Sequence, residues 1–181
     1  MHIDAWDEVF IRCRRQSANG LIVHVPSWGE WWPGLAVGPV PGSAGHDLSF
    51  STPLRLPRRQ HLVLTADRVR PRDKGLEWSV TGDVTGTGEW YHLDHPGGVV
   101  VHYLLRGTLT SGNPRRWLAA HRSSVRAALT SLKTRLEAGR LPGAEPHPQL
   151  LAFQAGELAT FAREVAQHEA EKAAAATAEG R

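Results

Sequence analysis

The sequence predicts an α+β fold in which an antiparallel sheet of about six or seven strands wraps a long helix. Two observations carry this prediction. Between residues 35 and 110, short segments of β-forming residues alternate with turn signals. After residue 113 the apolar residues recur at spacings of three and four, which is the period of a helix. Because the strands are separated by short turns, they are expected to pair as hairpins, and hairpins give an antiparallel sheet.

The sequence of the N-terminal part predicts one strand followed by two short helices. Residues 7–11 are rich in β-forming side chains, and residues 16–25 are compatible with a short helix that Pro26 ends. Ser27 precedes Glu30 by three residues, which is the spacing of a capping box, so a second helical turn is expected there. That turn carries Trp28, Trp31 and Trp32.

The remaining strands are predicted in the central part of the sequence. We expect them at residues 35–40, 47–52, 60–70, 76–83, 88–93 and 98–110, and we expect turns between some of them at residues 72–75, 85–87 and 95–98. In the last strand the residues of one parity are apolar: Val99, Val101, Tyr103, Leu105 and Leu109. His102, Arg106 and Thr108 have the other parity. This alternation is typical of a sheet that is covered on one face.

A long amphipathic helix is predicted at residues 114–137. Asn113 suits the N-cap, Pro114 suits the first helical position, and Gly139 suits the C-terminal end. Its apolar stripe comprises Leu118, His121, Val125, Leu129, Leu132 and Leu136. A helix with one apolar stripe needs a surface to cover, and the apolar face of the sheet supplies it.

Residues 1–139 are therefore expected to form one domain. Residues 140–148 contain three prolines and predict a linker, and residues 149–181 predict a helical extension that is frayed at its end. Within the extension, an apolar stripe of Leu151, Leu158, Phe161 and Val165 would favour a protein-interaction module, or a homodimer, if the stripe were exposed.

Composition narrows the class of protein. The single cysteine, Cys13, excludes an intramolecular disulfide and is compatible with a reducing compartment. Neither a signal peptide nor an apolar run long enough to span a membrane is evident, so a cytoplasmic protein is expected. The formal net charge is only +3, and the basic residues are scattered along the sequence. No nucleic-acid partner is therefore expected.

The ordered set of elements resembles the START-like superfamily, also called SRPBCC, which includes polyketide cyclases/dehydrases and lipid-transport proteins. The resemblance covers about residues 2–139. It rests on the segment WGEWWPG after the first strand, GDVTGTGEW in the middle of the sheet, the Gly-Gly turn into VVVHYLLRG, and the closing helix. It implies a helix-grip fold, with a curved sheet enclosing an apolar cavity against the long helix. It implies a hydrophobic ligand but no shared catalytic motif.

The aromatic residues are the first candidates for a binding site. A flat apolar ligand can stack on such rings, and indole N–H or phenol O–H groups can orient a carbonyl. The best candidates for the cavity wall are Trp32, Trp78, Trp90 and Tyr103, together with His121 and Val125 from the long helix. Most tryptophans in a protein of this size would otherwise be ordinary core residues.

Metal and cofactor sites are not predicted. His92, His95 and His102 lie around one predicted hairpin and would need to converge, with a further ligand, to bind zinc. The glycines at 82, 86 and 88 do not form a dinucleotide fingerprint, because a strand follows them, and close strand packing explains them better. No cofactor is expected.

Three functions remain open from the sequence. The first is a carrier or sensor that binds a hydrophobic small molecule in an internal cavity. The second is a cyclase- or dehydrase-like enzyme, for which His121, Tyr103, Glu89 and Arg106 are the weak catalytic candidates. Glu89 would be a usable acid if it faced an apolar cavity. The third is an interaction module acting through the C-terminal helix.

Overall fold

The computed structural model describes residues 1–51 and 60–137, together with residues 156, 159, 160, 163, 166 and 167. The chain divides into two compact units, Met1–Ala144 and Glu145–Arg181. The six described residues of the second unit are helical and exposed. The predicted linker at 140–148 and the apolar stripe of the extension lie outside the described residues, so both remain predictions.

The first unit contains a seven-stranded sheet in its described residues. Its strands are β1 His2–Ile11, β2 Leu35–Pro39, β3 His46–Phe50, β4 Gln60–Val69, β5 Gly75–Gly82, β6 Val84–His95 and β7 Gly98–Leu109. They lie in the order β1-β7-β6-β5-β4-β3-β2, and every neighbouring pair is antiparallel. This confirms the predicted antiparallel sheet.

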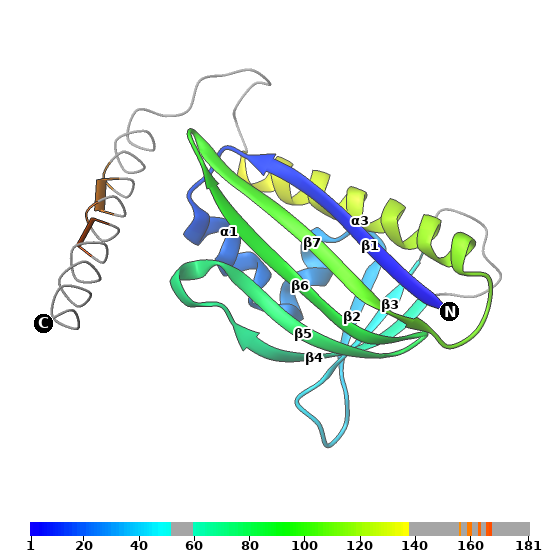
Figure 1. Ribbon diagram of the computed structural model, residues 1–181. Coiled ribbons are helices and arrows are strands. Elements are labelled where there is room, and N and C mark those ends of the chain that lie inside the picture. Colours follow the sequence, from blue (N-terminus) through cyan, green and yellow to red (C-terminus); the bar gives the residue numbers. More distant parts are fainter. Residues whose placement is uncertain (52–59, 138–155, 157–158, 161–162, 164–165, 168–181) are drawn as a thin grey trace, which may run out of the picture. The chain divides into compact units, whose positions relative to one another are not determined.

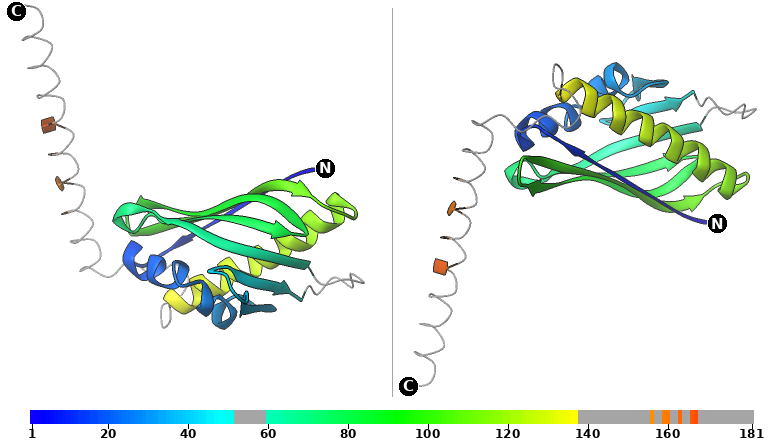
Figure 2. Two further views of the ribbon diagram at one scale, coloured as in Figure 1. Left: turned by 90° about the horizontal axis from the view of Figure 1, so that it is seen from below. Right: turned by 90° about the horizontal axis from the view of Figure 1, so that it is seen from above.

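Helices lie on one side of this sheet. They are α1 Arg15–Ile22, η1 Val25–Ser27, α2 Trp28–Trp31 and α3 Pro114–Leu136, while the short η2 Pro71–Asp73 lies in the turn after β4. The sheet curves around α3, and α1 and α2 lie on the same concave side (Figures 1 and 2). This confirms the helix-grip architecture. None of the described helices is long and apolar enough to cross a membrane.

The two predicted helix caps have different outcomes. The Asn113 side chain accepts a hydrogen bond from the backbone N–H of Arg116 at 3.1 Å, so the cap of α3 is confirmed. The capping box at Ser27 is wrong. Because η1 runs directly into α2, Ser27 itself has helical backbone angles, and its hydroxyl donates to the carbonyl of His24 at 2.8 Å.

The apolar faces of the sheet and of α3 meet as predicted. Val99, Val101, Tyr103 and Leu105 of β7 are buried, while Arg106 is exposed. The buried residues of α3 are Trp117, Ala120, His121, Ser124, Val125, Ala128, Leu129 and Leu132. The core therefore lies between the concave face of the sheet and α3.

Strand β1 is an edge strand, and α3 protects it. Arg122 donates to the carbonyl of Trp6 at 3.2 Å, and Lys133 donates to the carbonyl of Phe10 at 2.6 Å. Asp7 accepts hydrogen bonds from Arg122 and Arg126. Burial alone would raise the pKa of Asp7, but these two arginines lower it overall. The contacts fix α3 against the sheet and satisfy carbonyls that an open edge would expose.

Strand β6 begins four residues earlier than predicted, and the turn expected at 85–87 is wrong. The chain turns at Gly82, whose φ is +102°. Gly86 and Gly88 instead lie within β6, where neighbouring atoms occupy the positions that a Cβ atom would need. A Cβ atom at Gly86 would lie 2.0 Å from the carbonyl oxygen of Arg106, and one at Gly88 would lie 2.5 Å from the ring of Trp78. Close packing, as the glycine pattern suggested, explains both residues.

A prediction follows for Gly86. The substitution Gly86→Ala should lower the free energy of unfolding by about 2 kcal/mol, because β7 must move to admit the methyl group. Gly38→Ala in β2 is the matched control, since no atom lies within 4 Å of its added Cβ. Urea denaturation followed by circular dichroism measures both. Equal stability of the two variants would contradict the predicted close approach.

Candidate ligand-binding site

Six aromatic side chains occupy the space between the sheet and α3. They are Trp28, Trp31, Trp32, Trp78, Trp90 and Tyr103, and all are buried. Their rings contact one another with centroids 4.8 to 6.3 Å apart. The WGEWW segment supplies three of the rings. Trp31 and Trp32 follow Trp28 by three and four residues, so the helical turn of α2 places all three side chains on the same buried side. The interior is therefore mainly a surface of aromatic rings.

A hydrogen-bonded pair lies at the edge of these rings. The hydroxyl of Tyr103 on β7 and Nε2 of His121 on α3 are 2.8 Å apart, and both side chains are buried. Burial lowers the pKa of His121 to about 3, although the charge of Asp7 opposes this shift. Burial also raises the pKa of Tyr103. At neutral pH the imidazole is therefore neutral and the phenol keeps its proton.

The position of the imidazole proton follows from the partners of the pair. Within the described residues, His121 is the only hydrogen-bond partner of the Tyr103 hydroxyl, and Nδ1 of His121 has no partner. If Tyr103 donates to Nε2, only one buried group is left unsatisfied. If His121 donated instead, both the phenol proton and the Nδ1 lone pair would lack a partner. We therefore place the imidazole proton on Nδ1, where it can be donated to another molecule.

Trp117 and Gln60 extend the polar edge of the interior. The indole of Trp117 stacks on the imidazole of His121, with centroids 4.7 Å apart and planes 17° apart. The amide nitrogen of Gln60 donates to the backbone carbonyl of Trp117 at 2.7 Å. Tyr103, His121, Trp117 and Gln60 thus form a continuous row of contacts from β7 across α3 to β4.

Several buried polar atoms of the interior have no hydrogen-bond partner in the described part of the chain. Among the aromatic rings and this row they are Nε1 of Trp31, Trp90 and Trp117, Nδ1 of His121 and Oε1 of Gln60; Oδ1 of Asn19 and Nε2 of His92 are also buried and unpartnered. By contrast, Nε1 of Trp32 donates to the hydroxyl of Ser124 at 2.9 Å, and Nε1 of Trp28 donates to the carbonyl of Ile22 at 2.8 Å. Since most buried polar groups in proteins are hydrogen-bonded, each of these unpartnered groups could hydrogen-bond a further molecule.

The predicted site residues separate into two groups. Trp32, Trp78, Trp90, Tyr103, His121 and Val125 all lie in the interior. Glu89 and Arg106 do not, which corrects their assignment to the cavity. Glu89 pairs with Arg70, and Arg106 lies 3.5 Å from Asp4. The reason is alternation along each strand, because neighbours of the inward Trp90 and Leu105 must point outward.

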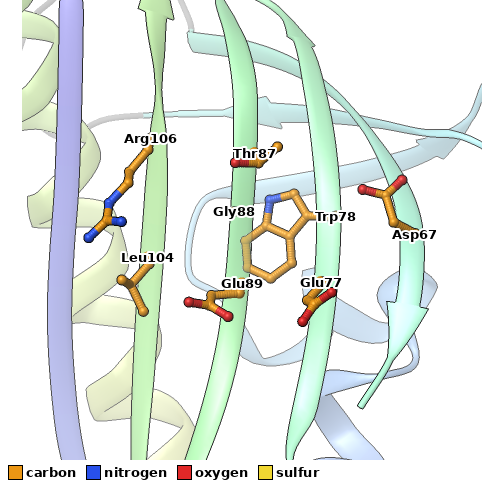
Figure 3. Close-up of a pocket in the computed structure, with 8 residues that line it drawn as sticks. All are labelled: Asp67, Glu77, Trp78, Thr87, Gly88, Glu89, Leu104 and Arg106. Carbon is orange, nitrogen blue, oxygen red and sulfur yellow. The ribbon is translucent and has the colours of Figure 1, made fainter.

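Glu89 and Arg106 instead line a pocket of about 330 Å³ on the convex face of the sheet (Figure 3). Asp67, Glu77 and Thr87 lie beside them, and Trp78 and Gly88 also contribute to the wall. Glu77 pairs with Arg68 of β4 and with Arg70, which follows β4, and Glu89 also pairs with Arg70. Asp83, which follows Gly82 in the sequence, accepts a hydrogen bond from the backbone N–H of His61 at 2.9 Å. None of these carboxylates faces the aromatic interior.

The histidines of the β6–β7 hairpin do not converge. His92 is buried on the concave side, with Nδ1 2.9 Å from the carbonyl of Asp73. His102 lies on the other face, 3.0 Å from Glu8. His95 packs edge-on against Phe10. Across the described residues, no group of three or more His, Cys, Asp or Glu side chains is arranged to hold a metal ion.

Gln60 and Ser124 are interior residues that the sequence analysis missed. Gln60 has the same parity in β4 as Leu62 and Leu64, so a polar residue on an apolar face was a signal available from the sequence. Ser124 follows His121 by three residues on the buried face of α3. Trp117 stacks on His121 because one helical turn brings residues four apart to the same face of α3.

Comparison with known proteins supports the fold. No protein-family model and no curated protein matches the chain. Solved structures do match. The Zhui aromatase/cyclase from Streptomyces sp. R1128 aligns with a TM-score of 0.63 and 10% identity, over 80% of this chain and 99% of that one. A START superfamily protein from Mycobacterium smegmatis aligns with a TM-score of 0.57 and 9% identity, over 76% and 98% of the two chains.

A third match is the Aha1 dimer from Colwellia psychrerythraea, with a TM-score of 0.54, 13% identity, and coverage of 77% of this chain and 99% of that one. At these identities the likeness concerns the fold alone. The chain has a START-like helix-grip fold, and its structural neighbours include a protein described as an aromatase/cyclase.

Proposed function

We propose that this protein binds a hydrophobic small molecule between the concave face of the sheet and α3, and acts as a carrier or sensor of that molecule. The observation that carries the proposal is the set of unpartnered polar atoms along the aromatic interior. An aromatic surface supplies favourable burial for an apolar ligand, and a few polar groups fix its orientation. The fold of the aromatase/cyclase and START neighbours is compatible with such a role.

A ligand would bind by displacing contacts between the rings. Contacts from ring to ring are replaced by contacts from ring to ligand, so the apolar surface stays covered both with and without the ligand. The rings are held by a few specific bonds, such as that between Trp32 and Ser124. Trp31 and Trp90 lack such a bond, so their movement breaks no hydrogen bond within the described part of the protein.

The test uses the full chain and the planar hydrocarbon fluorene as probe. Fluorene should bind with 1:1 stoichiometry in isothermal titration calorimetry. In nitrogen-15 NMR spectra, the indole N–H signals of interior tryptophans should shift, because the ring currents of the probe act on them. Trp6 on the convex face is 51% exposed and serves as the internal control. Native mass spectrometry of the freshly purified protein should also detect a bound small molecule.

Two results would contradict the proposal. One is the absence of both a retained molecule and probe binding. The other is binding that shifts only the Trp6 signal, which would place the probe on the outer surface.

The Tyr103–His121 pair favours an enzyme as the second candidate, with a cyclase- or dehydrase-like proton transfer on a carbonyl substrate. Its Nδ1 proton is available, and the pair lies beside the aromatic surface. The pKa of His121 is the reason that the enzyme is ranked as the second candidate. A general base works best when its pKa is near the working pH, whereas burial lowers the pKa of His121 to about 3.

Proton exchange distinguishes the two candidates. For a carrier, the α-protons of 2-tetralone should exchange with deuterium oxide at the same rate with and without the protein. For an enzyme, exchange should accelerate and should return to the buffer rate in the variant His121→Gln. Proton NMR of the ketone measures the rate. Acceleration that survives the substitution would exclude His121 as the catalytic group.

The interaction module remains the third candidate. It depends on the stripe of Leu151, Leu158, Phe161 and Val165, which lies outside the described residues. A homodimer through this segment therefore stays a prediction, and sedimentation of the full chain would measure it.

A further inference from the structure

The outer face of α3, opposite the aromatic interior, carries charge of one sign. The helix contains no aspartate or glutamate, and its six basic residues are Arg115, Arg116, Arg122, Arg126, Lys133 and Arg135. Within the first unit, no other described helix or strand covers this face (Figure 2). A surface of one charge sign attracts ligands of the opposite sign.

The two halves of this face differ in how far their charge is neutralised. Lys133 and Arg135, near the C-terminal end, each pair with a glutamate of their own. The four arginines of the N-terminal half share one carboxylate, that of Asp7. Two of the four, Arg115 and Arg116, form no ion pair in the described part of the chain. An excess of three positive charges therefore lies on the N-terminal half of α3.

The surface of this half is hollowed. A pocket of about 320 Å³ is lined by Ala119, Arg122, Ser123 and Arg126. Ala119 and Ser123 are one helical turn apart and have small side chains, so they leave a hollow beside the two arginines. Ser123 is exposed, and its hydroxyl makes no hydrogen bond among the described residues. It can therefore donate to a ligand in the pocket.

Asp7 holds both arginines beside the hollow without using all their donors. Its carboxylate accepts from Nε of Arg122 at 3.0 Å and from Nε of Arg126 at 2.8 Å. Nη2 of Arg122 donates to Asp7 and to the carbonyl of Trp6, which leaves Nη1 of Arg122 and both Nη atoms of Arg126 without a described partner. The Asp7 side chain is only 12% exposed, so it is a fixed anchor. Arginines that are already anchored lose less conformational freedom when they bind an anion.

We infer that this pocket binds the phosphate group of a phosphate monoester. Such a group carries nearly two negative charges at neutral pH and has three acceptor oxygens. Its charge matches the positive excess, and its oxygens match the unused N–H groups of Arg122 and Arg126 and the hydroxyl of Ser123. A carboxylate offers one charge and two oxygens, so it matches less well. The site is independent of the ligand proposed for the interior.

Inorganic phosphate is the probe for the first test, with the full chain in nitrogen-15 NMR. The backbone N–H signal of Ser123 and the Nε–H signal of Arg126 should shift and saturate, with a dissociation constant on the order of 1 mM. Sodium chloride at the same ionic strength should not reproduce these shifts, because it screens charge without donating or accepting specific hydrogen bonds. Dimethyl phosphate should bind more weakly than inorganic phosphate, since it carries a single charge.

Two matched variants place the phosphate in the pocket. Arg126→Gln should weaken binding about tenfold, because it removes a guanidinium group that touches the ligand. Arg135→Gln makes the same change of charge about 13 Å further along the helix, beyond a Debye length, and should change the affinity by less than about twofold. Circular dichroism reports whether each variant folds. Ser123→Ala, which should weaken binding a few-fold, decides the question if Arg126→Gln does not fold.

Vesicles distinguish a lipid headgroup from a soluble phosphate ester. If the phosphate belongs to a lipid, vesicles of phosphatidylcholine and phosphatidic acid in equal parts should sediment the wild type and Arg135→Gln but not Arg126→Gln. If the ligand is soluble, the wild type should remain in the supernatant while inorganic phosphate still binds.

Three results would overturn the inference. They are shifts that chloride reproduces, an equal loss of affinity in Arg126→Gln and Arg135→Gln, and binding to vesicles without binding of inorganic phosphate. None of them affects the fluorene experiment, so the proposed binding function stands or falls separately.

Discussion

The substitution Trp90→Ala should lower the free energy of unfolding by about 4 kcal/mol, the largest effect expected for one aromatic side chain of this core. Trp90 is fully buried at the centre of the concave face. Its ring contacts Trp28, Trp31, Trp32, Trp78 and Tyr103. Removing it takes away one partner from five rings at once, and large aromatic neighbours cannot collapse into the space without changing their rotamers.

The matched control for this experiment is Trp6→Ala on β1. Trp6 is 51% exposed, so its loss should change the stability by no more than about 0.5 kcal/mol. Urea denaturation at neutral pH compares the two variants with the wild type. If Trp90→Ala costs no more than Trp6→Ala, the interior is not held by ring packing. Addition of fluorene should also stabilise the wild type more than Trp90→Ala, because ligand and ring share one surface.

Periodicity in the sequence was sufficient to predict which elements carry the interior residues. Alternation along β7 placed Tyr103 on the apolar face, and the spacing of three and four along α3 placed His121 on the buried stripe. The bond between them was not predictable. It depends on how far α3 slides along the sheet, and that offset is fixed by packing and by contacts such as those of Asp7 with Arg122 and Arg126.

Alternation could also have excluded two catalytic candidates. Glu89 is adjacent to Trp90, so the two side chains must point to opposite faces of β6. Arg106 is three residues from Tyr103, an odd spacing, and it points outward for the same reason. Glutamate and arginine are common catalytic residues. However, their odd spacing from Trp90 and Tyr103 along the strands places them on the opposite face from the cavity.

The start of β6 was missed for a different reason. Thr85-Gly86-Thr87 has the composition of a turn, and local propensity cannot distinguish a turn glycine from one required by close packing. The glycine spacing favoured close packing, and the Arg106 carbonyl beside Gly86 and the Trp78 ring beside Gly88 identify the groups that require it. The unpartnered N–H groups of the site were unpredictable in the same way, because satisfaction of a hydrogen bond is a property of the packed structure.

Two buried histidines should make the protein less stable as the pH falls below about 6.5. Burial lowers the pKa of His121 to about 3, and burial lowers the pKa of His92 to about 4, with the bond to the Asp73 carbonyl opposing part of the second shift. Between pH 6.5 and 5 the unfolded chain therefore binds a proton at each histidine and the folded chain does not. Because the unfolded state takes up more protons, acid favours unfolding.

The expected loss is about 1 kcal/mol per pH unit for each histidine, and it is absent above the ordinary pKa of 6.5. Urea denaturation at several pH values between 5 and 7.5 measures the slope. His121→Gln and His92→Gln should each remove about 1 kcal/mol per pH unit of it. A smaller part should remain from His46, whose pKa is also lowered by burial. The slope is informative even where a variant is less stable overall, since it depends on protons bound and not on packing lost.

The choice of pH window separates the histidines from the acids. The pKa of Asp7 is lowered by its two arginines, and that of Glu137 is lowered by its bonds with Lys133 and the backbone N–H of Arg12, in each case against the effect of burial. These carboxylates lose their contribution only as the pH falls through and below about 4, so they leave the slope above pH 5 largely unchanged. An unchanged slope in both histidine variants would therefore mean that neither imidazole is kept neutral by burial. Nε2 of His121 would then carry a proton and could not accept the hydrogen bond from Tyr103.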